Sequence, residues 1–85
     1  MDIQTKRRSN ERKFTNWIEL PNGGRRYLFE IKGKHGWSAK YIKEVDLNEE
    51  ATRFWQEIYN AKGILVEIHE KYPEDKGHRV IVEER

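Results

Sequence analysis

The chain has 85 residues, of which 38% are charged, with a formal net charge of +2 and no cysteine. This size allows one domain, and the lack of cysteine excludes a disulfide framework and a thiolate metal site. No apolar run is long enough for a signal-peptide core or a membrane span, so we expect a cytoplasmic protein without membrane contact. The abundance of Lys, Arg and Glu is also typical of thermophile proteins, in which surface ion pairs are dense.

The positive charge is concentrated at the N-terminus. Residues 1–13 carry a net charge of +3, whereas residues 14–85 carry −1. The first segment shows no periodic apolar pattern, and its only branched aliphatic residue is Ile3. We therefore predict a flexible basic arm over residues 1–13, followed by a single folded domain over residues 14–85.

The next part of the chain predicts three strands. The stretches FTNWIEL, RRYLFEIK and WSAKYIKEV each alternate apolar and polar residues, which is the pattern of a strand with one buried face. The dipeptide Asn22-Gly23 favours a two-residue type I′ hairpin turn, and GKHG (33–36) favours a second tight turn. We expect the three strands to form an antiparallel meander.

The segment DLNEEATRFWQEIYNAKG (46–63) admits two interpretations. As a helix it has a capping box that begins at Asp46, and its apolar residues fall at helical spacing on one face. As a strand, TRFWQEIY (52–59) is rich in β-formers and leads into NAKG, which suits a type I turn with a bulge. Periodicity favours the helix, because a strand would place Gln56 and Glu57 among the aromatic residues of the two faces.

Two further strands, ILVEIHEKY (64–72) and HRVIVEE (78–84), flank the polar turn PEDKG. With a helix over residues 47–62, the order of elements is β-β-β-α-β-β. The sequence thus predicts an α+β fold, a five-stranded antiparallel sheet with one amphipathic helix packed on one face. If residues 52–59 form a strand instead, an all-β meander or a partly open barrel results.

One helix covers only one face of such a sheet, so the other face is expected to present one apolar residue per strand. These residues are Trp17, Leu28, Ile42, Leu65 and Ile81. The long stems of neighbouring Lys, Arg and Glu residues can cover such a row while their charges stay in water. Otherwise the row is an interface, either for a protein partner or for a homodimer formed sheet to sheet.

Motifs for catalysis are absent from the sequence. The chain has no H-E-x-x-H, C-x-x-C or nucleophile-elbow pattern, and we expect neither a metal nor another cofactor. Its histidines are His35, His69 and His78, and regular strand parity places the last two on opposite faces of the sheet. A small toxin-type ribonuclease is an alternative, because its chemistry needs only a few acidic, basic and cationic groups. The cluster for it would be Glu67, His69, Lys71 and Arg79.

The charge distribution suggests nucleic-acid binding as the first hypothesis for function. Lysines and arginines bind nucleic acid by displacing counterions from phosphates, and we expect RNA or a ribonucleoprotein rather than DNA. The candidate contacts are Lys6, Arg7, Arg8, Arg12, Lys13, Arg25 and Arg26, with Trp17 or Trp37 available to stack on a base. The prediction is therefore a non-enzymatic binding domain, with the protein interface on the sheet as the alternative.

Overall fold

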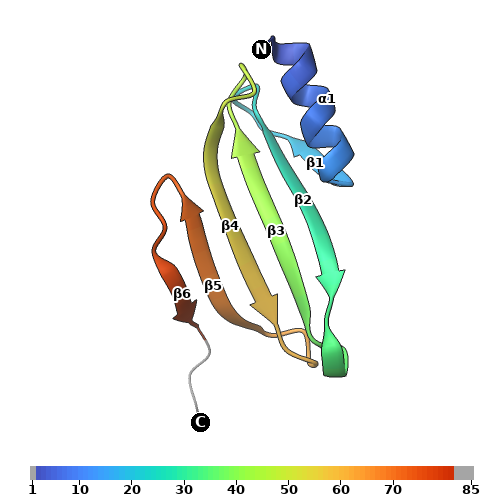
Figure 1. Ribbon diagram of the computed structural model, residues 1–85, viewed down its shortest axis with the longest axis vertical. Coiled ribbons are helices and arrows are strands. Elements are labelled where there is room, and N and C mark those ends of the chain that lie inside the picture. The colour runs from blue at the N-terminus through green and yellow to red at the C-terminus, as the bar shows by residue number, and fades with distance from the viewer. Residues whose placement is uncertain (1, 82–85) are drawn as a thin grey trace.

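The computed structural model describes residues 2–81, which form an antiparallel sheet of six strands and one α-helix. The strands lie in the order β1-β2-β3-β4-β5-β6, so every pair of neighbours is also consecutive in the chain (Figure 1). The elements are α1 (Ile3–Lys13), β1 (Asn16–Glu19), β2 (Arg25–Lys32), the short 3₁₀ turn η1 (Lys34–Gly36), β3 (Ser38–Val45), β4 (Ala51–Tyr59), β5 (Leu65–Tyr72) and β6 (Gly77–Val80). The predicted small α+β class is confirmed, with six strands in place of five and without closure into a barrel. Residues 82–84 of the last predicted strand lie outside the described residues.

The predicted helix over residues 47–62 is wrong, because most of this segment forms β4. This strand pairs with β3 on one side and with β5 on the other, so it lies inside the sheet. The alternative prediction, a strand that ends in the NAKG turn, is confirmed. Asn60 N–H donates to the Ile64 carbonyl at 3.0 Å, and Gly63 has a φ of +78°.

The two polar residues that argued against a strand bond to the aromatic residues around them. On one face, Gln56 Nε2 donates to the Tyr41 hydroxyl at 2.9 Å. On the other face, Glu57 accepts hydrogen bonds from Trp55 Nε1 at 2.8 Å and from the Tyr59 hydroxyl at 2.6 Å. Aromatic donors that are partly buried need such partners, so a polar residue between them is compatible with a strand.

Three connections in the sheet use the same turn. The loops cover residues 20–24, 46–50 and 60–64, and each has the same two backbone hydrogen bonds. The N–H of the first residue donates to the carbonyl of the fifth residue, and the N–H of the fourth residue donates to the carbonyl of the first. The fourth residue has a positive φ in each, at Gly23 (+89°), Gly63 (+78°) and Glu49 (+65°). Glycine takes this conformation without strain, whereas a residue with a Cβ is strained by roughly 1–3 kcal/mol. Glu49 therefore sits where glycine is expected, and something else must hold it there.

The first of these turns has a different length from the predicted one, and this changes the face of the sheet on which each side chain of β1 lies. The predicted two-residue turn would pair Trp17 with Leu28 and place both on the same face. The observed turn has one more residue, and Trp17 pairs with Tyr27 instead. Because side chains alternate with a period of two, this shift by one residue moves Trp17 to the opposite face of the sheet.

The sheet has two faces that differ in character. We call the face that carries α1 the helix face, and its main rows contain Tyr27, Lys43, Phe54 and Tyr72, then Phe29, Tyr41, Gln56, His69 and His78. We call the other the reverse face, and its central row contains Leu28, Ile42, Trp55 and Glu70. The main apolar core is on the helix face, where Phe14, Tyr27 and Val45 are fully buried.

Residues 3–13 form helix α1, so the prediction of a flexible arm over residues 1–13 is corrected for the part that the structure describes. Asp2 caps the helix, since its Oδ1 accepts the backbone N–H of Thr5 at 2.8 Å. Arg12 and Lys13 lie in the last turn, where cations interact favourably with the helix dipole. Asn10 is the buried residue of this helix, which explains why hydrophobic periodicity gave no sign of it.

A buried carboxylate attaches α1 to the sheet. Glu49 is only 4% exposed and accepts a hydrogen bond from the Tyr27 hydroxyl. The helix contributes Arg7 Nε at 3.3 Å and Asn10 Nδ2 at 3.3 Å to the same carboxylate. Lys43 Nζ in turn donates to Asn10 Oδ1 at 2.9 Å. We call Glu49, Tyr27, Arg7 and Asn10 the Glu49 clamp, and its bonds offset the backbone strain at Glu49.

Removing this carboxylate should destabilise the protein strongly. In Glu49→Ala, the Tyr27 hydroxyl and Asn10 lose a buried partner while the strained backbone remains. We expect the free energy of unfolding to fall by about 3 kcal/mol, as for other buried charged hydrogen bonds. Urea denaturation followed by circular dichroism measures this change.

Two further variants separate the clamp from general effects at this loop. Glu50→Ala, at the neighbouring position, removes an exposed ion pair with Lys6 and should lower the free energy of unfolding by less than about 1 kcal/mol. Glu49→Gly should be more stable than Glu49→Ala by roughly 1 kcal/mol, because glycine relieves the positive φ. Equal stability of the Glu49→Ala and Glu50→Ala variants would contradict the role given to the clamp.

The clamp also predicts how stability depends on alkaline pH. Burial, followed by the hydrogen bond to Glu49, raises the pKa of Tyr27 to about 12. The folded state thus holds this proton more tightly than the unfolded chain, in which the pKa of tyrosine is about 10. Its contribution to stability is complete below pH ~10 and is lost as the pH rises from about 10 to about 12. Urea unfolding between about pH 10 and 12 should show a steeper loss of the free energy of unfolding for the wild type than for Tyr27→Phe. Parallel plots of this free energy against pH would contradict the prediction.

Candidate functional site

One row of side chains on the helix face crosses five strands. Helix α1 lies along β1 and β2 and leaves β4, β5 and β6 uncovered (Figure 1). The row contains Phe29, Tyr41, Gln56, His69 and His78, each directly opposite the next. The β2–β3 end of the row is aromatic, and the β5–β6 end carries the two histidines. We call it the cross-strand row.

The aromatic half of this face forms a continuous platform. The rings of Phe29 and Tyr41 are stacked, with centroids 5.0 Å apart and planes at 16°. Phe14, at the end of α1, joins this pair through Phe29 at 5.4 Å and reaches Phe54 at 6.5 Å. Phe29, Tyr41 and Phe54 are only partly buried, so part of each ring faces solvent.

Three lysines stand among these rings. Lys71 Nζ lies 5.3 Å from the centroid of the Tyr41 ring and 5.7 Å from that of Phe54. Lys43 projects from β3 on the same face, and Lys13 ends helix α1. Within residues 2–81, none of the three forms an ion pair with a carboxylate.

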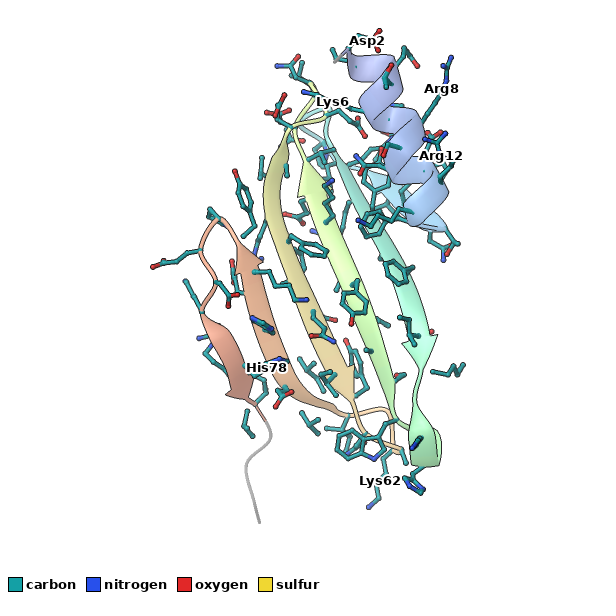
Figure 2. The ribbon with its side chains drawn as sticks, viewed as in Figure 1. Asp2, Lys6, Arg8, Arg12, Lys62 and His78 are labelled. Atoms are coloured by element: carbon teal, nitrogen blue, oxygen red, sulfur yellow. The ribbon has the colours of Figure 1, made fainter. Side chains whose placement is uncertain are left out.

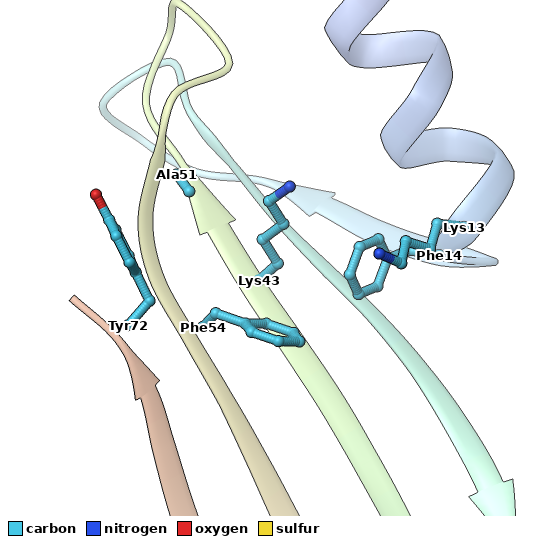
Figure 3. Close-up of a pocket in the computed structure, with 6 residues that line it drawn as sticks. All are labelled: Lys13, Phe14, Lys43, Ala51, Phe54 and Tyr72. Carbon is cyan, nitrogen blue, oxygen red and sulfur yellow. The ribbon is translucent and has the colours of Figure 1, made fainter. Parts of the chain in front are cut away.

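Two of these lysines line a pocket beside the helix. The pocket has a volume of about 270 Å³ and is lined by Lys13, Phe14, Lys43, Ala51, Phe54 and Tyr72. Figure 3 shows Lys43 among these side chains, with Phe54 and Tyr72 toward β5 and Lys13 and Phe14 toward the helix. Burial, and then the charge of Lys13, lower the pKa of Lys43. An anion placed between the two ammonium groups would relieve their repulsion.

The reverse face has the opposite arrangement of charge. Its central arginines are paired, Arg26 Nε with Glu44 Oε2 at 2.6 Å and Arg53 Nε with Glu70 Oε2 at 3.1 Å. The guanidinium of Arg53 also lies 4.2 Å from the centroid of the Trp55 ring and covers it. The two central arginines are therefore satisfied internally, and Arg53 covers Trp55. Lys40 and Arg79, which lie on the same face, form no ion pair within residues 2–81.

The predicted basic contacts divide into two groups. Four of them are held in ion pairs: Lys6 with Glu50, Arg7 with Glu49, Arg25 with Glu11 and Glu19, and Arg26 with Glu44. Arg8, Arg12 and Lys13 are exposed. Figure 2 shows Arg8 on the side of α1 away from the sheet and Lys6 on the side toward the strands. Only the second group is available to a ligand without breaking an ion pair that the structure shows.

The predicted apolar row does not exist as one surface. Leu28 and Ile42 lie opposite each other on the reverse face, but Ile42 is only 4% exposed and Trp55 occupies the next position. Trp17 is on the helix face, where the guanidinium of Arg25 lies 5.1 Å from its ring. Leu65 pairs with Tyr59 at the other end of the sheet, and Ile81 follows β6.

The histidines lie differently from the prediction. His69 and His78 are directly opposite each other on β5 and β6, so they share the helix face, and strand parity alone misplaced them. Their register follows from the turn over residues 73–76, which the sequence pattern does not determine. Of the predicted ribonuclease cluster, Arg79 pairs with Ile68 and therefore lies on the reverse face. His35 is distant in sequence from the other two histidines; it lies in the β2–β3 connection and has a φ of 60°.

Sequence reasoning missed Tyr41, Phe54 and Lys43 as members of a surface. Alternation in the strands indicated that Tyr41 and Phe29 share a face. The position of Phe54 and Lys43 beside them becomes visible only once β4 is known to pair with β3.

Some types of site have no counterpart in the described residues. Among residues 2–81, no three His, Asp or Glu side chains come together as ligands for a metal ion. Helix α1 lacks both the length and the apolar character of a membrane-crossing helix. A comparison with protein-family models finds no match, and comparisons with curated proteins and with solved structures find none either.

Proposed function

We propose that the chain binds single-stranded nucleic acid, RNA in particular, across the helix face of the sheet. The observation that carries this proposal is the set of three lysines without carboxylate partners among partly exposed aromatic rings. Single-stranded nucleic acid combines flat bases, which stack on aromatic rings, with phosphates, which attract ammonium groups. On the reverse face the two central arginines are already paired, and Lys40 lies over the single ring of Tyr59 rather than beside a stacked platform.

The positions of the aromatic rings and lysines on the helix face suggest how a nucleic-acid strand lies on the sheet. Bases stack on the Phe29–Tyr41 platform and on Phe54, while Lys71 and Lys43 neutralise phosphates between them. The pocket between Lys13 and Lys43 receives a further phosphate or a base with its phosphate. Such a ligand also offsets the desolvation of Lys43, because an anion favours the charged amine.

RNA is favoured over DNA by analogy with another small sheet domain. RNA-recognition domains bind unpaired bases on aromatic residues of an open antiparallel sheet, and this chain offers the same kind of surface on another topology. A cytoplasmic location, which the cysteine-free sequence predicts, is consistent with an RNA ligand.

The alternative, a protein partner or homodimer on the predicted apolar row, receives less support. That row is split between the two faces, and its central residue Ile42 is buried within the chain. A sheet-to-sheet interface needs a contiguous apolar patch, which these residues do not form.

Binding should depend on the lysines of the helix face and not on those of the reverse face. A fluorescently labelled 12-nucleotide oligouridine should lose about three- to tenfold affinity for each of Lys13→Gln, Lys43→Gln and Lys71→Gln, measured by anisotropy at low salt. Lys40→Gln is the matched control, because Lys40 lies on the reverse face over the Tyr59 ring. The logarithm of affinity should fall with the logarithm of salt with a slope of about −2 for three phosphate contacts. Equal losses in Lys40→Gln and Lys43→Gln would overturn the assignment of the face.

The aromatic contribution is tested at Tyr41. Tyr41→Leu removes the flat ring and should weaken binding roughly tenfold or more, because stacking on one aromatic side chain contributes about 1–3 kcal/mol per base. Tyr41→Phe keeps the ring and loses only the hydroxyl that accepts from Gln56, so its affinity should stay near that of the wild type. If Tyr41→Leu binds as tightly as Tyr41→Phe, bases do not stack on this platform.

A further inference from the structure

Two histidines stand side by side at the end of the cross-strand row. The rings of His69 on β5 and His78 on β6 have centroids 4.2 Å apart and planes at 47°. Both project from the helix face, and Gln56 separates them from Tyr41. His69 is half-buried, His78 is exposed, and Figure 2 marks the latter at the β6 edge. A nucleic-acid strand whose bases stack on the aromatic half of the row therefore continues over the two histidines.

Each histidine has its own carboxylate. His69 Nε2 lies 2.7 Å from Asp75 Oδ1, and His78 Nδ1 lies 2.9 Å from Glu67 Oε1. The backbone N–H of Gly77 also donates to Asp75 at 2.9 Å, and this bond, followed by that from His69, lowers the pKa of Asp75. A carboxylate accepts hydrogen bonds only, so the bonded ring nitrogen carries the proton. The second nitrogens, Nδ1 of His69 and Nε2 of His78, are left to accept or donate a proton.

We propose that His69 and His78 cleave RNA bound to the helix face, as a general base and a general acid. This inference rests on the proposed function, since it needs an RNA strand lying along the row. One neutral imidazole takes the proton of a ribose 2′-hydroxyl, whose oxygen then forms a bond to the adjacent phosphorus. The bond from phosphorus to the 5′-oxygen breaks, and the other imidazole, in its protonated form, gives its proton to that oxygen.

The products balance the reaction. They are a 2′,3′-cyclic phosphate and a free 5′-hydroxyl, and the proton taken up by one histidine equals the proton given by the other. Exchange with water restores the starting protonation states. The 2′-hydroxyl is the attacking group, so DNA is bound but is not a substrate.

Charges near the pair suit this step. Negative charge builds up on the phosphate oxygens in the transition state, and a nearby cation stabilises it. Lys71 lies two residues from His69 on β5, and its ammonium group is on the helix face beside Tyr41. Asp75 and Glu67 each accept a hydrogen bond from one imidazole and so fix the orientation of the two rings.

The experiment uses the full chain and a labelled 12-nucleotide RNA. We expect cleavage that yields cyclic phosphate and 5′-hydroxyl ends, resolved by gel electrophoresis and mass spectrometry. His69→Ala and His78→Ala should each slow cleavage by about 10²- to 10⁴-fold, the usual loss for a general acid or base. His35→Ala is the matched control, purified in the same way, and should cleave at the wild-type rate because His35 lies in the β2–β3 connection. Circular dichroism establishes that each variant is folded, and the exposed His78 tolerates the change best.

The outcomes separate this inference from the proposed function. RNA that binds by anisotropy but stays intact overturns the cleavage proposal and leaves binding in place. Absence of binding overturns both. Cleavage of an otherwise identical strand with 2′-deoxyribose, or a rate in His78→Ala equal to that of His35→Ala, overturns the assigned chemistry.

Discussion

The buried carboxylate of Glu49 is the contact on which the rest of this structure depends. It lies in the β3–β4 loop, and it binds Tyr27 in the sheet together with Arg7 and Asn10 of the helix. Because α1 has only one buried residue, its position is set by these polar bonds, by the ion pairs of Lys6 with Glu50 and Glu11 with Arg25, and by Phe14 at its end. The backbone at Glu49 is strained for a residue with a Cβ, so the loop and the helix stabilise each other. The consequence is a helix that covers one end of the helix face and leaves its other end open.

The pairing of charges distinguishes the two faces more clearly than their apolar content does. Arg26 and Arg53 on the reverse face have carboxylate partners, and Arg53 covers Trp55. On the helix face, Lys43 and Lys71 lie among aromatic rings without such partners in the described residues. An isolated cation on a platform of rings suits a ligand with alternating negative charges and flat bases. The proposed function rests on this contrast. The two histidines lie on the same face, at the end of the cross-strand row.

Much of the fold was predictable because local patterns and local turns agree. The strands β2, β3 and β5 appear in the alternation of their residues, and the turn at Asn60 to Gly63 was present in the alternative interpretation. Helix α1 was missed because it docks through Asn10 and charged residues, which leave no hydrophobic period. The segment of β4 was misassigned because Gln56 and Glu57 broke the alternation, although both bond to aromatic neighbours.

The amino-acid sequence by itself determined the existence of most strands and the excess of positive charge at the N-terminus, but not which segment is the helix. Only the tertiary structure decided which cations are available and which side chains share a face. The reason is that both depend on register: one additional residue in the first turn moved Trp17 across the sheet, and the turn before β6 brought His69 opposite His78. Propensities act on neighbours in the chain, whereas register is set by long-range packing and by turns whose lengths the pattern leaves open.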